Sequence, residues 1–178
     1  MKKLFYSLVI FTMSSCSSQE SPKTYFDIAD ECAHKSNLLM EKKGFQPYCC
    51  GGSYRGTFRS TIYSYYTKQY RFTDVADARA LLIENALQFA ESFNNEKRIR
   101  MYLHNFPFEL KNIELSIHFH DDKDIKLYPP YITSVSNRSG TIVYSQYDPI
   151  EKSTVLHKES VDEALKLYNE HKINIQKE

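Results

Sequence analysis

Two histidines and the acids that follow them form the segment whose residue types most readily support chemistry. His118 and His120 are separated by one residue, and an acidic run that includes Asp122 comes directly after them. Residues two apart on a β-strand point to the same side, as two ligands of one metal ion must. A metal-dependent or hydrolytic site would use His118, His120 and Asp122. A solvated strand end followed by a turn is the favoured interpretation, because the sequence identifies no further ligand.

Three internal cysteines, Cys32, Cys49 and Cys50, are candidates for a disulfide. A bond between the neighbours Cys49 and Cys50 would strain the peptide that joins them. We therefore expect Cys32 to pair with Cys49 or Cys50 in an oxidising compartment. Such a bridge would pin residues 46–52 as a turn. Catalysis by one of these cysteines is less favoured, because no basic environment or helix N-terminus is visible beside them.

Tyrosine is abundant in this chain, with 14 residues, whereas tryptophan is absent. Residues 56–72 alternate in polarity and predict one long strand. The even-numbered apolar residues from Phe58 onward are assigned to the core face. Tyr63 and Tyr65 then lie on the solvated face with Arg59, where they would form a surface for a small ligand. The simpler interpretation is that tyrosine is a favourable strand residue.

Three helices are predicted around these segments, because apolar residues recur in each at intervals of three or four. They cover residues 25–43, 75–93 and 161–171. Asp74 and Ser160 are expected to cap the second and third helices, and Gly44 to end the first.

Further strands are predicted over residues 113–120, 131–136, 141–147 and 153–157. The first of them directs Ile117 and Phe119 to the core, so His118 and His120 face the other way. A turn that ends at Gly140 joins two of the strands as a hairpin. Strands joined by short turns are antiparallel. The expected fold class is therefore α+β, an antiparallel sheet of four to five strands with helices packed mainly on one face.

The N-terminus has the pattern of an export signal. Met1-Lys2-Lys3 precedes a stretch of about ten mostly apolar residues, half of what a membrane-spanning helix needs. The following Met13-Ser14-Ser15-Cys16 resembles the lipobox of bacterial lipoproteins. This resemblance, which covers only the first 16 residues, implies that Cys16 is acylated and that the chain is cut just before it. Ser17 favours the outer membrane if the cell is Gram-negative.

This pattern divides the chain into a signal peptide (1–15), a lipidated cysteine with a polar tether (16–23) and one α+β domain (24–178). Removing the first 15 of the 178 residues takes away two lysines, which changes the net charge from +1 to −1. A balance so close to neutral gives no reason to expect nucleic acid as a partner.

The expected function is that of a membrane-anchored envelope lipoprotein, a non-enzymatic binding or structural module without a cofactor. Its partner would be an envelope protein or a glycan. One alternative is a metal-dependent or hydrolytic envelope enzyme that uses His118, His120 and nearby acids. The other is a small-ligand binder that uses the tyrosine-rich sheet face.

Overall fold

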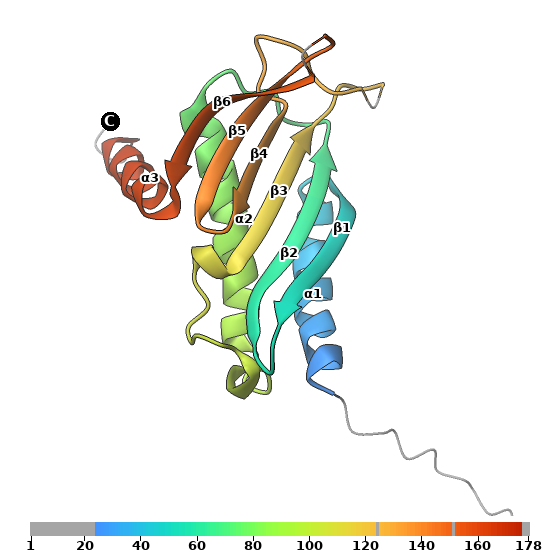
Figure 1. Ribbon diagram of the computed structural model, residues 1–178, viewed down its shortest axis with the longest axis vertical. Helices are drawn as coiled ribbons and strands as arrows, with labels where there is room; N and C mark the ends of the chain where they lie inside the picture. Colours follow the sequence, from blue (N-terminus) through green and yellow to red (C-terminus); the bar gives the residue numbers. More distant parts are fainter. Residues whose placement is uncertain (1–23, 124, 151, 176–178) are drawn as a thin grey trace, which may run out of the picture.

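The computed structural model describes residues 24–175 apart from positions 124 and 151 (Figure 1). The signal, the lipobox and the tether lie outside the described residues. Short 3-10 helices, η1 and η2, accompany the main elements. The elements are α1 (Tyr25–Lys42), β1 (Phe45–Tyr54), β2 (Phe58–Thr67), α2 (Val75–Asn95), η1 (Arg100–Tyr102), η2 (Leu110–Asn112), β3 (Ile113–Phe119), β4 (Ser134–Arg138), β5 (Thr141–Asp148), β6 (Lys152–Ser160) and α3 (Val161–Ile175).

The strands of the described region form one sheet of six strands, whose spatial order is their order along the chain. Neighbouring strands are antiparallel except for β2 and β3, which are parallel. The exception arises because α2 carries the chain back to the end of the sheet where β2 began. The α+β class is confirmed, but the predicted antiparallel sheet of four to five strands is corrected to a mixed sheet of six.

The additional strand is β1. Residues 46–52, which the sequence predicted as a turn, instead pair with β2 along a ladder that runs from Phe45–Thr67 to Tyr54–Phe58. Two adjacent glycines, Gly51 and Gly52, obscured this strand, because glycine is depleted in β-structure.

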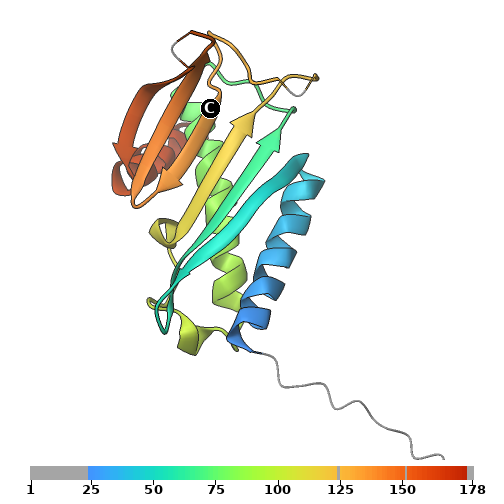
Figure 2. The same cartoon turned by 45° about the vertical axis from the view of Figure 1, so that its right-hand side comes forward.

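The helices lie behind the sheet, as the two views in Figures 1 and 2 show. Helix α1 contacts β1 and α2, α2 contacts β3 and β4, and α3 contacts α2, β5 and β6. The opposite face of the sheet, which is turned toward the viewer in Figure 1, is left open.

Side chains cap the three helices at their N-termini. Thr24 and Asp27 form a capping box on α1, Asp74 accepts the N–H of Ala76 at 2.7 Å, and Ser160 accepts the N–H of Glu163 at 3.1 Å. Helix α1 ends before Gly44, which has a φ of +78°. A Cβ atom there would lie 2.0 Å from the flexible end of the Gln69 side chain, which can move away, so it is the positive φ that favours glycine.

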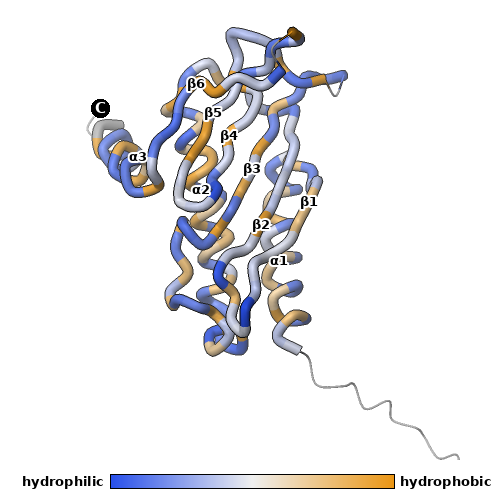
Figure 3. The backbone as a smooth tube through the Cα atoms, in the orientation of Figure 1, coloured by the Kyte–Doolittle hydropathy of each residue, from blue (hydrophilic) through white to orange (hydrophobic). Residues whose placement is uncertain are grey.

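The core lies between the sheet and the helices. Along β3 the residues Ile113, Leu115, Ile117 and Phe119 are fully buried and alternate with more polar ones, as predicted, and this alternation can be followed in Figure 3. The hairpin between β4 and β5 has positive φ at Ser139 and Gly140, which is the backbone of a type I′ turn.

The assignment of faces on β2 was wrong. Thr61, Tyr63 and Tyr65 point into the core, whereas Ile62 and Tyr66 point outward. Phe58 is buried as expected, but the alternation reverses between it and Thr61, so extrapolation from Phe58 placed the rest of the strand on the wrong face.

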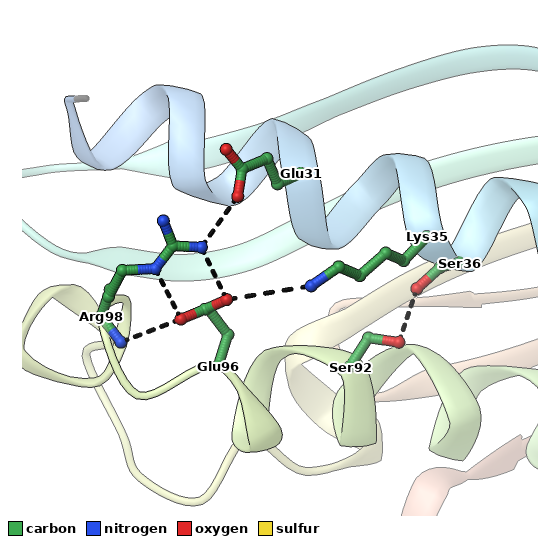
Figure 4. A network of polar contacts seen from close by, with 6 residues as sticks. All are labelled: Glu31, Lys35, Ser36, Ser92, Glu96 and Arg98. Atoms are coloured by element: carbon green, nitrogen blue, oxygen red, sulfur yellow. Dashed lines mark hydrogen bonds and ion pairs between the residues drawn. The ribbon is translucent and has the colours of Figure 1, made fainter.

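A polar network joins α1 to the segment that follows α2 (Figure 4). The guanidinium of Arg98 lies 2.8 Å from a carboxylate oxygen of Glu31 and 2.8 Å from one of Glu96. Ser36 donates to the hydroxyl of Ser92 at 2.9 Å, where the two helices meet. Hydrogen bonds from Arg98 lower the pKa of Glu96 to about 2, so this carboxylate stays ionised in mildly acidic solution.

Candidate functional site

The open face of the sheet is formed largely by small polar side chains. Ser64, Ser116 and Ser136 are direct neighbours across β2, β3 and β4. In the next row toward the upper end of the sheet, Tyr66 of β2 is paired with His118 of β3, and His118 is paired with Ser134 of β4. A depression lies at this end of the open face, beside the rings of Tyr66 and His118.

We call this depression the ring hollow. It has a volume of about 250 Å³ and is lined by Tyr48, Tyr66, His118, His120 and Lys126. The register of β1 shifts at Tyr48, between Pro47 and Cys49, and the tyrosine side chain is 76% exposed. A bulge of this kind redirects a side chain from the regular alternation. A larger open depression of about 560 Å³ lies around the start of β1 and shares Tyr66 with the ring hollow.

Lys126 reaches the ring hollow because the chain turns back on itself after β3. His120 and Lys126 form an antiparallel bridge. The carboxylate of Asp121 accepts the N–H groups of Lys123 and Ile125 at 2.8 and 2.9 Å, which fixes the turn between them. These backbone hydrogen bonds lower the pKa of Asp121.

The ring hollow combines aromatic surface with one fixed positive charge. The Tyr66 and His120 rings stack with centroids 5.5 Å apart. The Lys126 ammonium lies 5.0 Å from the ring centroid of Tyr147. Burial, together with the charge of Lys126 and the neighbouring His120, lowers the pKa of His118. His118 is therefore neutral at pH 7 and keeps a nitrogen that can accept a hydrogen bond.

His118 and His120 share one side of the sheet as predicted, but both are half-buried instead of solvated, because Tyr48 and Lys126 join them around the hollow. Asp122 lies elsewhere, with its carboxylate 3.8 Å from Arg71 and its side chain 89% exposed. Within the described part of the chain, no three His, Cys, Asp or Glu side chains converge in a way that could hold a metal ion.

The expected disulfide is not formed in the structure. Cys32 is a buried free thiol, and Cys49 and Cys50 are exposed free thiols on β1. Cys49 is paired with Ser64 on the open side, whereas Cys50 is paired with the inward-facing Tyr63. The bridge was predicted from an oxidising compartment and from the strain of a bond between the neighbours Cys49 and Cys50, and the segment that it would have pinned as a turn is part of β1.

Tyr63 and Tyr65, proposed from the sequence as surface residues, are 3% and 0% exposed, and burial raises the pKa of both hydroxyls. Tyr65 donates to Asn37 of α1. Arg59 is exposed, but its two partners in the predicted patch lie on the other face. The tyrosines that lie on the open face are instead Tyr48 and Tyr66. A correct assignment of the two faces of β2 would have identified Tyr66.

A second polar cluster, which the sequence did not reveal, lies inside the fold. Arg79 of α2 donates to both carboxylate oxygens of Glu159 at 2.8 and 2.9 Å, and Tyr144 donates to the same carboxylate. Burial alone would raise the pKa of Glu159, but these hydrogen bonds outweigh it and the pKa is lowered. The Glu159 side chain is completely buried. The cluster thus connects α2, β5 and β6 from within.

No protein-family model matches this chain, and neither do any curated proteins or solved structures. None of the helices between residues 24 and 175 combines the length and the apolar character that crossing a bilayer requires. The described residues form an α+β fold. Helices cover one face of its sheet, and the other face is open around the ring hollow.

Proposed function

We propose that this chain is a lipid-anchored protein of the bacterial envelope, and that its domain is a non-enzymatic binding module. The resemblance of residues 13–16 to a lipobox supports attachment to a membrane through Cys16, and Ser17 favours the outer membrane if the cell is Gram-negative. The observation that carries the binding role is the open sheet face with the ring hollow at one end of it.

The lining of the ring hollow determines which ligand it suits. Tyr48 and Tyr66 offer flat rings that pack on the face of a sugar, at low cost in side-chain entropy. Lys126 supplies positive charge, and a neutral His118 accepts a hydrogen bond from a hydroxyl. At about 250 Å³ the hollow is smaller than the roughly 300–1,000 Å³ of most ligand pockets, so it accommodates one ring of a longer partner. An acidic glycan of the envelope combines these properties.

The metal-dependent or hydrolytic alternative has less support. It needs an acid beside His118 and His120, and Asp122 is directed toward Arg71. The residues that join the two histidines at the hollow are instead tyrosines and a lysine.

The proposal predicts binding of carboxylate-bearing glycans by the native lipidated protein. Calorimetric titration in detergent micelles should show saturable binding of muramic-acid-containing peptidoglycan fragments, and weaker binding of chitotetraose, which lacks the carboxylates. Lys126→Met should weaken the first interaction about fivefold, which corresponds to the roughly 1 kcal/mol of an exposed charge pair.

Lys123→Met is the matched control. Lys123 lies on the same turn and is exposed, but it does not line the ring hollow. Equal losses for the two lysine variants would place binding outside the hollow. Failure of both sugars to bind would refute the glycan as the ligand.

A further inference from the structure

The end of the molecule at which the described chain begins combines exposed apolar side chains with basic ones. In Figures 1 and 2 this end contains the start of α1, the β1–β2 turn and the η1 segment. Phe26 is 48% exposed, Met101 78% and Phe106 52%. We call this end, residues 24–26, 54–58 and 97–106, the tip.

Aromatic rings at the tip form one continuous cluster. Tyr25 lies with its ring centroid 4.4 Å from that of Phe26, 4.9 Å from Tyr54 and 5.1 Å from Tyr102. The ring of Phe26 lies 5.2 Å from Tyr54 as well. Tyrosine combines an apolar ring with a polar hydroxyl, which suits the boundary between lipid and water, and phenylalanine adds apolar area to the cluster.

Basic side chains surround this cluster. Arg55 is exposed on the β1–β2 turn, and Lys97 and Arg100 are exposed beside η1. The Arg100 guanidinium lies 4.6 Å from the ring centroid of Phe106, so apolar surface and positive charge occur at the same place. Two of the nearby acids, Glu31 and Glu96, are in ion pairs with Arg98, which reduces the negative potential that they contribute.

Covalent geometry limits how far the tip can be from a lipid attached to Cys16. Seven residues lie between Cys16 and Thr24. The eight residue steps from one to the other span at most about 3.6 Å each, or roughly 29 Å in all. One lipid anchor holds a protein more firmly when a basic or amphipathic surface adds a second contact.

We propose that the tip is a membrane-contact surface, which inserts Phe26, Met101 and Phe106 among the headgroups of an anionic bilayer while Arg55, Lys97 and Arg100 contact lipid phosphates. This inference rests on the proposed anchoring through Cys16. It fixes the orientation of the domain, with the tip on the membrane and the ring hollow directed away from it.

The chain contains no tryptophan, so the fluorescence of a single introduced tryptophan reports on its own position. Phe106→Trp places one fluorophore at the tip, and Ile150→Trp places one at the opposite end, where Ile150 is 89% exposed on the β5–β6 turn. Both lipidated variants are reconstituted into vesicles of phosphatidylcholine and phosphatidylglycerol, with or without brominated acyl chains. Fluorescence of Phe106→Trp should fall at least about twofold in brominated vesicles, whereas that of Ile150→Trp should not change.

Two further measurements separate the possible outcomes. Adding Lys97→Glu and Arg100→Glu to Phe106→Trp should abolish the quenching while vesicle flotation still shows the protein attached. Attached protein without quenching of Phe106→Trp would overturn the membrane contact and leave the anchor intact. Protein that fails to float would overturn both proposals. A blue shift of Phe106→Trp that grows with protein concentration and needs no lipid would identify a second copy of the chain as the occupant.

Discussion

The thiol of Cys32 is completely buried on the inner side of α1. Burial, with a smaller contribution from the charge of Glu96, raises its pKa to about 11. Since the thiolate is the reactive form, Cys32 is protonated and inert at neutral pH. Cys49 and Cys50, by contrast, are exposed on an edge strand.

This difference predicts two classes of thiol in the reduced native protein. At pH 8, Cys49 and Cys50 should react with a chromogenic disulfide reagent promptly. Cys32 should react roughly 100-fold more slowly, because a pKa of about 11 leaves only about one Cys32 thiol in a thousand as thiolate and burial excludes the reagent. Cys32→Ala should remove only the slow phase. A single reactive thiol, with a disulfide at Cys32 found by mass spectrometry, would instead restore the bridge that the sequence suggested.

Sequence reasoning could find part of the ring hollow. Alternation along β3 sufficed to place His118 and His120 on one face, because their neighbours Ile117 and Phe119 are unambiguously apolar. It could not find Lys126, which reaches the hollow through a bridge to His120. It also could not find Tyr48, whose direction depends on a bulge that leaves no local signature.

At the scale of elements, the contact between Arg79 of α2 and Glu159 of β6 connects a helix to an edge strand. Both oxygens of the carboxylate accept hydrogen bonds from one guanidinium. Such a buried pair fixes how two elements meet, although it adds less net stability than its short distances suggest.

Arg79→Ala should therefore lower the free energy of unfolding by about 3 kcal/mol, because the Glu159 carboxylate would stay buried without its partner. Denaturant unfolding monitored by circular dichroism measures the change. The double variant Arg79→Leu with Glu159→Leu is the control and should recover most of the loss. A double variant as unstable as the single one would show that burial of the charge is not the cause.

The same pair also predicts a dependence on pH. The pKa of Glu159 is below its ordinary value of 4.5 in the folded protein. The contribution of the ionised Glu159 to the free energy of unfolding is thus complete above pH 4.5 and is lost as the pH falls through the lowered pKa. Acidification from pH 5 to pH 3 should consequently destabilise the native protein more than the double leucine variant.

The helices were predicted closely, because periodicity and capping residues act locally. Helix α1 ends within one residue of its predicted boundary, and Asp74 and Ser160 cap α2 and α3 as expected. Strand β1 and the parallel pairing of β2 with β3 were not predicted. Both depend on contacts between segments far apart in the chain, and the sequence of each strand does not encode its partner.

At the scale of the whole molecule, the tip and the ring hollow lie at opposite ends of the long axis (Figure 1). If Cys16 carries the proposed lipid, the seven residues between it and Thr24 keep the first end near the bilayer. The second end would then project from the membrane, where a glycan can reach it.

The anchor itself is tested at Cys16. Cys16→Ser should abolish metabolic labelling by palmitate and release the domain from the membrane fraction, because the thiol is the acceptor of the lipid. Fractionation and immunoblotting give the distribution, and Cys49→Ser serves as a matched control that should keep the label. Labelling that survives Cys16→Ser would show that the lipobox interpretation is wrong.

The edge strands of the sheet are β1 and β6, and each has features that disfavour pairing with a strand of another molecule. Pro47 in β1 has no N–H to donate, and the bulge beside it interrupts the ladder. On β6, Leu156 is an extra residue in the register, and Lys152 and Lys158 add charge. Proteins held on a membrane are confined to two dimensions, where edge strands meet often and in similar orientations. If this chain is anchored as proposed, its blunted edges would let many copies crowd together there without joining into aggregates.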